Sequence, residues 1–202
     1  MGYFPFFIEF ADKKGLVVGG GTVALRKVVK LLPFAPSLTV AAQTVLPEIE
    51  DRPEITVLHE PFSPEMLEGM YFVIAATDDA AVNQEIGRLC REQGILVNVV
   101  DAPDDCTFLF PALVKEGNLS VGISTGGASP SASVWLKETI REQLPENMEE
   151  ILDFLASVRI RLKGTIPENQ RSKLYADLFD ACMNQGRGLT ENELAKMLEE
   201  IP

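Results

Sequence analysis

Short apolar runs alternate with helix-length segments through the first half of this chain, and the alternation predicts its fold. The runs with the length and composition of buried strands are residues 16–18, 37–41, 55–59, 71–76 and 95–100. Helical patterns cover residues 22–32, which end at Pro33, and residues 80–93, which end at Gly94. Strands and helices that alternate at this spacing predict a doubly wound parallel sheet with right-handed crossovers. Residues 6–10 predict one further short strand ahead of the sheet.

The pattern changes after the fifth of these strands. Residues 107–110 and 119–124 are apolar runs with a short polar stretch between them, which predicts a β-hairpin in place of another crossover. A helix is expected over residues 131–142, and the rest has helical periodicity, with a capping box that begins at Thr190. The predicted domains are an α/β domain over residues 1–112, a hairpin and helix over 113–145, and a small helical domain over 146–202.

A glycine cluster joins the first strand of the sheet to its first helix. Gly19, Gly20, Gly21 and Ala24 match the G-x-G-x-x-G/A pattern of dinucleotide-binding Rossmann domains. Gly19 permits a sharp turn, Gly21 lets a pyrophosphate approach the backbone, and Ala24 lets the helix pack closely on the strand. The free N–H groups at the helix start then face the anion. Glycine-rich turns also simply join strands to helices, but the flanking strand and helix favour a nucleotide site.

The acidic residue that usually follows the second strand of such domains, where it binds the adenosine ribose, is missing here. The strand ends in Ala41-Ala42-Gln43-Thr44. Gln43 and Thr44 can hydrogen-bond the ribose instead, and the lack of an arginine nearby weighs against a 2′-phosphate. The sequence therefore favours NAD over NADP.

Charge and composition exclude several classes of function. The 202 residues carry a formal net charge of -12, which argues against binding to nucleic acid or to anionic membrane surfaces. No apolar run has the length of a membrane span and the first residues lack the features of a signal peptide, so a cytoplasmic protein is expected. Cys90, Cys106 and Cys182 are widely spaced and odd in number, which predicts reduced thiols.

Two stretches carry residues suited to chemistry. Asp101 follows the fifth strand, and because ligands bind beyond the carboxyl ends of parallel strands, its carboxylate is expected near the nicotinamide of a bound cofactor, as a proton acceptor. An Asx-Pro turn with solvated acids is an equally good interpretation of Asp101 and its neighbours Asp104 and Asp105. The hydroxyl- and glycine-rich residues 124–131 can bind carboxylates or phosphates, or can simply cap the next helix.

Other polar residues are interpreted as structural. His59, the one histidine, has no cysteine or histidine near it in sequence, and Cys106 lacks a histidine partner that would activate it. Arg26, Lys27 and Lys30 are interpreted as the solvated face of the first helix.

Taken together, five blocks of sequence resemble the precorrin-2 dehydrogenase/sirohydrochlorin ferrochelatase family, which also forms the amino-terminal part of multifunctional siroheme synthases. The blocks are Gly19 to Lys27, Ala75 to Asp79 with Val82-Asn83, Asn98 to Pro103, Phe108 with Pro111-Ala112, and Ser124 to Gly127 with Ser129-Pro130. Their order and spacing are far more specific than the glycine pattern alone, and the resemblance extends from Phe4 to about Leu162.

The resemblance implies NAD-dependent oxidation of precorrin-2 to sirohydrochlorin and, in bifunctional members, insertion of ferrous iron to give siroheme. It also implies a homodimer built through the hairpin and the helix after it. The family's essential aspartate corresponds to Asp101, which would also hold the iron transiently. A loop serine that is phosphorylated in some members corresponds to Thr125, with Ser124 just before it.

The site residues expected on this basis form two sets. The cofactor-binding set is Gly19, Gly20, Gly21, Thr22, Val23, Gln43, Thr44, Thr77 and Asp78, and the substrate-binding set is Ser124, Thr125, Gly126, Gly127 and Lys137. Because the sequence ends at Pro202 without the methyltransferase module, a separate uroporphyrinogen methyltransferase is expected to supply the substrate. The alternatives are an NAD-binding regulatory module and a tetrapyrrole-binding module, neither with catalysis.

Overall fold

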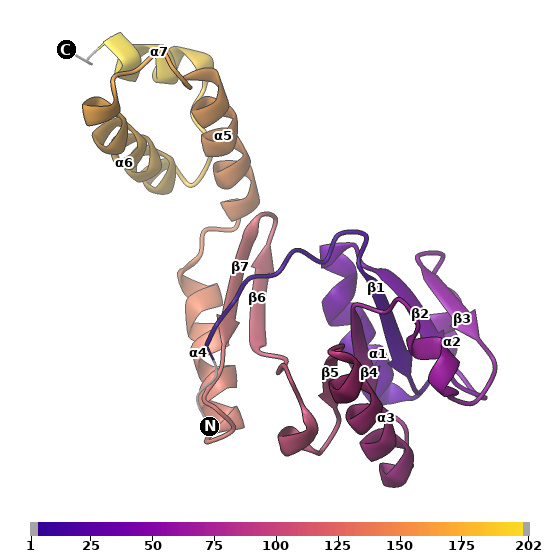
Figure 1. The fold of residues 1–202 in the computed structure, drawn as a ribbon. Coiled ribbons are helices and arrows are strands. Elements are labelled where there is room, and N and C mark those ends of the chain that lie inside the picture. Colours follow the sequence, from indigo (N-terminus) through magenta and orange to yellow (C-terminus); the bar gives the residue numbers. More distant parts are fainter. Residues whose placement is uncertain (1–3, 200–202) are drawn as a thin grey trace. The chain divides into compact units, whose positions relative to one another are not determined.

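A computed structural model of the protein describes residues 4–199. The chain divides into two compact units, one from Phe6 to Phe110 and the other built mainly from residues 111–199 (Figure 1). Within residues 4–199, no helix combines the length and the apolar character needed to cross a membrane.

The first unit is organised around a five-stranded parallel sheet. Its strands are β1 (Lys14–Val18), β2 (Ser37–Ala41), β3 (Ile55–Leu58), β4 (Phe72–Ala75) and β5 (Leu96–Val99), in the order β3-β2-β1-β4-β5 (Figure 1). All four residues of β4 are buried, as expected for a parallel strand covered on both faces. The predicted doubly wound α/β fold is confirmed.

Helices cover both faces of this sheet. On one face α1 (Thr22–Leu31) buries Ala24 and Val28, and on the other α3 (Ala80–Gln93) buries Ile86. Gly94 ends α3 in the left-handed conformation, with a φ of 70°, as the sequence predicts. The remaining helical segments are short: α2 (Pro47–Glu50) and the 3-10 turns η1 (Leu32–Phe34), η2 (Pro64–Leu67) and η3 (Pro103–Asp105).

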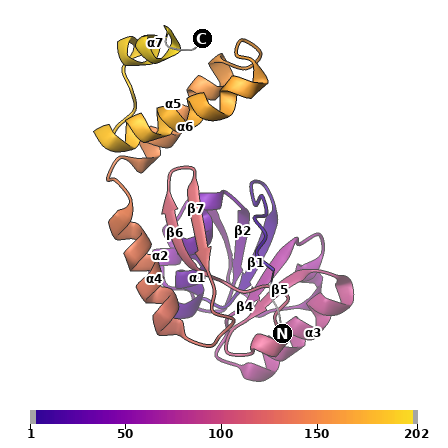
Figure 2. The same ribbon diagram turned by 90° about the vertical axis from the view of Figure 1, so that its left-hand side faces the viewer.

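The second unit contains an antiparallel hairpin followed by helices. The hairpin is β6 (Ala112–Glu116) with β7 (Leu119–Ile123), and α4 (Pro130–Gln143) lies against it (Figure 2). The helices α5 (Met148–Arg161), α6 (Glu168–Gln185) and α7 (Glu191–Glu199) share a core that includes Ile151, Val158 and Leu178. The capping box at the start of α7 is confirmed, because the Thr190 backbone N–H donates to Glu193 Oε2 at 2.7 Å.

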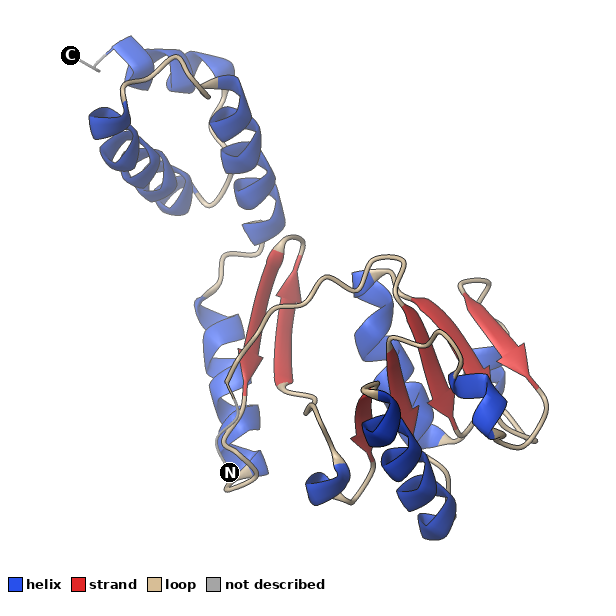
Figure 3. Cartoon of the chain, in the orientation of Figure 1, coloured by secondary structure: helices blue, strands red, loops and turns tan. Residues whose placement is uncertain are grey.

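The predicted strand at residues 6–10 is wrong. This stretch is loop (Figure 3), and the side chains of Phe6 and Phe7 are 76% and 79% exposed. A short turn at Asp12 leads from it directly into β1, so a strand here would have to pair with β1. Both edges of β1 are already occupied, by β2 and β4.

The predicted strand at residues 107–110 is also wrong, although the hairpin exists. Its first strand begins later, at Ala112. The backbone of the earlier residues pairs with β5 instead, because the Thr107 N–H donates to the Val97 carbonyl at 2.8 Å and Asn98 Nδ2 donates to the Phe108 carbonyl at 3.1 Å. Phe108 and Phe110 then pack against the core on the α1 face.

Candidate functional site

The glycine turn after β1 has the geometry that close approach of a ligand requires. Gly19 has a φ of 122°, and a Cβ there would lie 2.2 Å from the Ala76 carbonyl oxygen. A Cβ on Gly20 would lie 2.2 Å from the Thr44 carbonyl oxygen. Gly21, by contrast, has open space at its Cβ position, and no side chain caps the start of α1. An anion can therefore approach the N–H groups of this helix end.

A cavity of about 810 Å³ opens over the carboxyl ends of β1, β2 and β4. All nine residues of the predicted cofactor-binding set line it: Gly19, Gly20, Gly21, Thr22, Val23, Gln43, Thr44, Thr77 and Asp78. Its volume is in the range of sites for small molecules and cofactors. The structure thus brings these residues together, and their part in binding NAD stays a prediction.

The charge in this cavity is negative. The charged residues among those described as lining it are Asp78, Asp79 and Glu85, all carboxylates. Asp79 is partly committed to structure, because its Oδ1 accepts from the backbone N–H groups of Ala81 at 2.8 Å and Val82 at 3.2 Å. Nothing basic in this lining would pair with a 2′-phosphate, so the walls suit a free ribose hydroxyl.

Asn83, which the sequence analysis did not single out as a site residue, holds Thr77 at the edge of the cavity. Its side chain is buried, and its Oδ1 accepts from the Thr77 backbone N–H at 3.1 Å and from Thr77 Oγ1 at 2.8 Å. Its Nδ2 donates back to the Thr77 carbonyl at 3.0 Å. The sequence contains one indication of this role, because Asn83 is a polar residue at a position on the buried face of α3, where apolar residues are usual.

Asp101 lies at the same edge of the sheet, beyond the described lining of the cavity. Ala75 of β4 pairs with Val99 of β5, so Thr77 and Asp101 each stand two residues beyond that pair on neighbouring strands. Asp101 is exposed and has a φ of 60°, in the left-handed region that few residues other than glycine adopt. The backbone of Asp101 therefore has an unusual conformation, at the end of the strand that neighbours the one leading to Thr77 of the predicted cofactor-binding set.

The other two carboxylates of this segment do not act together with Asp101. Asp105 is bound to Arg91, whose Nη1 donates to its carbonyl at 2.8 Å and to its Oδ1 at 2.9 Å. Asp104 lies exposed within η3. The thiol of Cys106 is also structural, because it contacts the backbone N–H and carbonyl of Val99 at 3.1 and 3.2 Å. Burial raises the pKa of this thiol, which disfavours the nucleophilic thiolate.

Lys27 is not on a solvated face, contrary to the prediction for the first helix. It is partly buried, and its Nζ donates to Asn98 Oδ1 at 3.1 Å and lies 4.0 Å from the centre of the Phe110 ring. Burial is the main cause that lowers its pKa to about 8. Sequence spacing does not show this, because Asn98 lies 71 residues further along the chain and Phe110 further still, beyond any local period.

The predicted substrate-binding residues belong to the second unit. Ser124 to Gly127 form a tight loop before α4, in which Gly126 and Gly127 have φ values of 62° and 87°. The Thr125 hydroxyl accepts from the Ser129 N–H at 3.1 Å and Ser124 Oγ accepts from the Gly126 N–H at 3.2 Å. Lys137 pairs with Glu138 at 3.0 Å. The hydroxyls therefore stabilise the loop, and a role in binding substrate stays a prediction.

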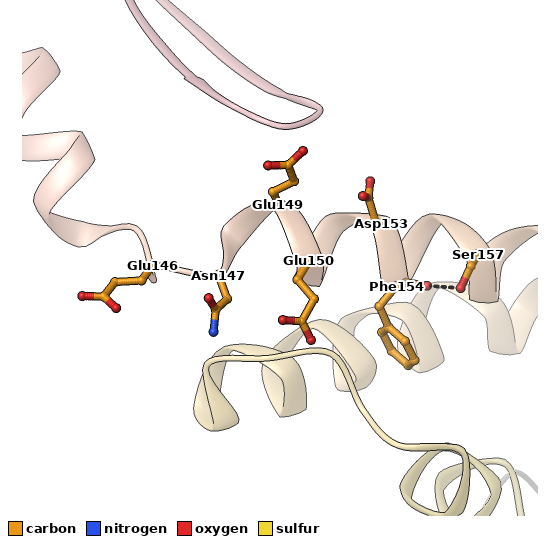
Figure 4. Close-up of a pocket in the computed structure, with 7 residues that line it drawn as sticks. All are labelled: Glu146, Asn147, Glu149, Glu150, Asp153, Phe154 and Ser157. Atoms are coloured by element: carbon orange, nitrogen blue, oxygen red, sulfur yellow. Dashed lines mark hydrogen bonds between the residues drawn. The ribbon is translucent and has the colours of Figure 1, made fainter.

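A second cavity, of about 610 Å³, lies along α5 (Figure 4). Its lining includes Glu146, Glu149, Glu150 and Asp153. The carboxylates do not converge, since Glu149 and Asp153 point to one side of the helix and Glu150 to the other (Figure 4). Within the described residues, no group of three or more His, Cys, Asp or Glu side chains is arranged to hold a metal ion. This cavity therefore offers neither a metal site nor a favourable surface for an acidic ligand.

Comparison with known proteins agrees with this geometry. Residues 6–112 match a family described as "Putative NAD(P)-binding", which is more than half of the chain. The chain belongs to this NAD(P)-binding family.

Individual relatives of this NAD(P)-binding protein are also informative. The siroheme synthase of Methylococcus capsulatus is 40% identical over 171 residues, which cover 83% of this chain and 36% of the relative. The siroheme synthase of Salmonella arizonae is 36% identical over 183 residues, which cover 89% of this chain and 40% of the relative. The chain thus spans less than half the length of these relatives. A solved structure described as SirC, precorrin-2 dehydrogenase, is 26% identical, with a TM-score of 0.76 over 98% of both chains.

Proposed function

We propose that the protein is an NAD-dependent dehydrogenase that oxidises precorrin-2 to sirohydrochlorin. The observation that carries the proposal is the likeness to the precorrin-2 dehydrogenase structure, which extends over 98% of both chains. The siroheme synthase relatives point to the same chemistry. The cavity beside the glycine turn supports a dinucleotide, because its backbone N–H groups and its open space at Gly21 suit a pyrophosphate.

NAD binds with its pyrophosphate at the start of α1 and its adenosine ribose at Gln43 and Thr44 after β2. The acidic lining of the cavity favours NAD over NADP. When bound, NAD supplies the acceptor for a hydride from a ring carbon of the substrate. Asp101 accepts the proton that leaves with it, so that two electrons and two hydrogen nuclei are removed in total. An exposed carboxylate at the carboxyl end of β5 is accessible for this role.

An anaerobic assay with precorrin-2 and NAD tests the function. One NADH formed for each sirohydrochlorin is the expected result, with the spectrum of each product as the measurement. Asp101→Asn should bind NAD like the unmodified protein and lose turnover. Binding of NAD or sirohydrochlorin without any NADH formation would instead favour a regulatory or carrier module. Ferrous iron added at the end of the assay tests metal insertion, which requires faster siroheme formation than in a reaction without protein.

The proposal includes a homodimer formed through the hairpin and α4. Val134 and Trp135 on α4 are 55% and 65% exposed, and large apolar side chains of this kind are typical of interface cores. Trp135→Glu should convert a dimer into a monomer, which light scattering on the purified protein would detect. Phe179→Glu, at an exposed apolar position of α6, is the matched control and should leave the molar mass unchanged.

A further inference from the structure

Lys27 carries a positive charge into a partly buried place where no carboxylate of residues 4–199 forms an ion pair with it. Its two close partners, the Asn98 amide oxygen and the Phe110 ring, have no net negative charge. Arg26 and Lys30 on the same helix lower its pKa further, while Asp101 and Cys106 on the facing segment act in the opposite direction. Burial of an ammonium group is unfavourable, and an apolar side chain of similar length would fill the space without that cost. A lysine here therefore points to a task other than packing.

Asn98, the partner of Lys27, is bonded to the segment that follows Asp101. Asn98 is 5% exposed, and its Nδ2 donates to the Phe108 carbonyl at 3.1 Å and contacts Cys106 Sγ at 3.5 Å. The same sulfur contacts the Ala102 carbonyl at 3.4 Å, directly after Asp101. The Asn98 amide and the Cys106 thiol thus hold this segment against β5, together with the bonds of Thr107 to Val97.

Asp101 needs such support because of its backbone. Its φ of 60° is unfavourable for a residue with a Cβ, and such conformations persist where the surroundings impose them. Arg91 holds the far end of the segment through Asp105. Asn98 holds the segment just beyond Asp105, at Cys106 and Phe108, and the Cys106 thiol reaches back to the Ala102 carbonyl. Asn98 in turn accepts from a lysine on the helix that starts at the glycine turn.

We propose that Lys27 and Asn98 are positioning residues for Asp101, which connect the helix of the nucleotide site to the turn that carries the proton acceptor. The Lys27 ammonium orients the Asn98 amide, and the amide in turn fixes the Phe108 carbonyl and the Cys106 thiol, which contacts the Ala102 carbonyl directly after Asp101. The proposal rests on the proposed function in taking Asp101 as the proton acceptor. The arrangement of the segment itself can be measured without catalysis.

The test uses the full chain with four variants. Lys27→Met removes the charge at similar length, Lys27→Arg keeps it, and Asn98→Asp keeps a partner for Lys27 but loses the donor to Phe108. Arg26→Met is the matched control, because it removes an exposed charge from the same helix. For each variant we would measure the dissociation constant of NAD, kcat and KM for precorrin-2, and the rate of Cys106 alkylation by iodoacetamide. Mass spectrometry separates Cys106 from the buried Cys90 and Cys182.

Lys27→Met and Asn98→Asp should lower kcat about 10- to 100-fold, as expected for a displaced catalytic group, and leave KM and NAD binding within about twofold. Both should also speed Cys106 alkylation several-fold when the rate is expressed per thiolate. The correction is needed because loss of the Lys27 charge, or a carboxylate at position 98, also raises the pKa of this thiol and lowers its thiolate fraction. Lys27→Arg should recover most of kcat, and Arg26→Met should match the kcat of the unmodified protein at pH values below the pKa of Lys27, where Lys27 is charged in both. The kcat of the unmodified protein should fall as the pH rises through about 8, where Lys27 loses its proton, and the Lys27→Arg profile should lack this decrease.

Unchanged Cys106 alkylation in both Lys27→Met and Asn98→Asp would overturn the inference, as would a loss of NAD binding in proportion to kcat. If the unmodified protein shows no turnover, the proposed function fails, and if Asp101→Asn retains turnover, only the role of Asp101 as proton acceptor fails. The alkylation rates then still decide whether Lys27 and Asn98 hold the segment.

Discussion

A single added methyl group, in Gly21→Ala, tests nucleotide binding at the glycine turn without disturbing the fold. At Gly21 a Cβ would meet nothing within 4 Å, and the backbone angles of φ -89° and ψ -170° are open to alanine. Gly21→Ala should therefore leave the free energy of unfolding within about 0.5 kcal/mol of the original, or raise it slightly by restricting the unfolded chain. The added methyl group would, however, occupy the space through which a pyrophosphate reaches the start of α1.

The expected loss of binding follows from that overlap. Forcing an extra methyl group into an occupied space typically costs about 1–3 kcal/mol, which corresponds to about 5- to 150-fold weaker NAD binding. Titration calorimetry measures the affinity, and thermal unfolding measures the stability of the same sample. NAD bound by Gly21→Ala with unchanged affinity would refute the placement of the pyrophosphate at this turn.

Gly19→Ala is the matched comparison. Its φ of 122° and a distance of 2.2 Å from the new Cβ to the Ala76 carbonyl oxygen mean that the backbone must move. This substitution should lower the free energy of unfolding by about 2 kcal/mol or more, together with NAD binding. If both variants lost stability equally, the conclusion that a Cβ at Gly21 meets open space would be wrong.

Three further predictions follow from the same unit. Because no basic side chain is found in the described lining of the cavity, NADP should bind at least about tenfold more weakly than NAD in parallel titrations, and equal affinities would contradict this. Asn83→Ala should lower the free energy of unfolding by about 1–3 kcal/mol, measured in urea, because the Thr77 N–H and hydroxyl lose their buried acceptor. Lys27 has a folded-state pKa of about 8, below its unfolded value of 10.5, so the unfolded chain binds more protons between these values and stability should rise with pH there. After discounting for solvent screening this gain is about 1–2 kcal/mol, and comparison with Lys27→Met in urea at about pH 7 and about pH 10 isolates it; equal pH dependence would contradict the lowered pKa.

Local sequence was sufficient for the parts of the fold that repeat along the chain. The continuous apolar run of β4, the Asp79 and Gly94 limits of α3, and the glycine turn after β1 all depend on neighbouring residues. These features are the strand period, helix capping and a glycine in the left-handed conformation. Each depends on a few consecutive residues, so it can be predicted without knowing the tertiary structure. The same local pattern located the glycines, Gln43 and Thr44 of the cavity lining, because they follow predicted strands, whereas the other expected residues came from the family resemblance.

Tertiary structure decided what depends on an available partner. Residues 6–10 have the pattern of a strand, yet both edges of β1 are occupied by β2 and β4. Residues 107–110 do not join the hairpin, because the Thr107 and Phe108 N–H groups donate to Val97 of β5. Lys27 has the sequence context of a solvated lysine and is instead drawn to Asn98 and Phe110. The pattern of apolar residues along a chain shows which face of a helix or strand is apolar. Only the assembled sheet determines which strand edges remain free for hydrogen bonding and which distant groups meet, because both depend on long-range contacts.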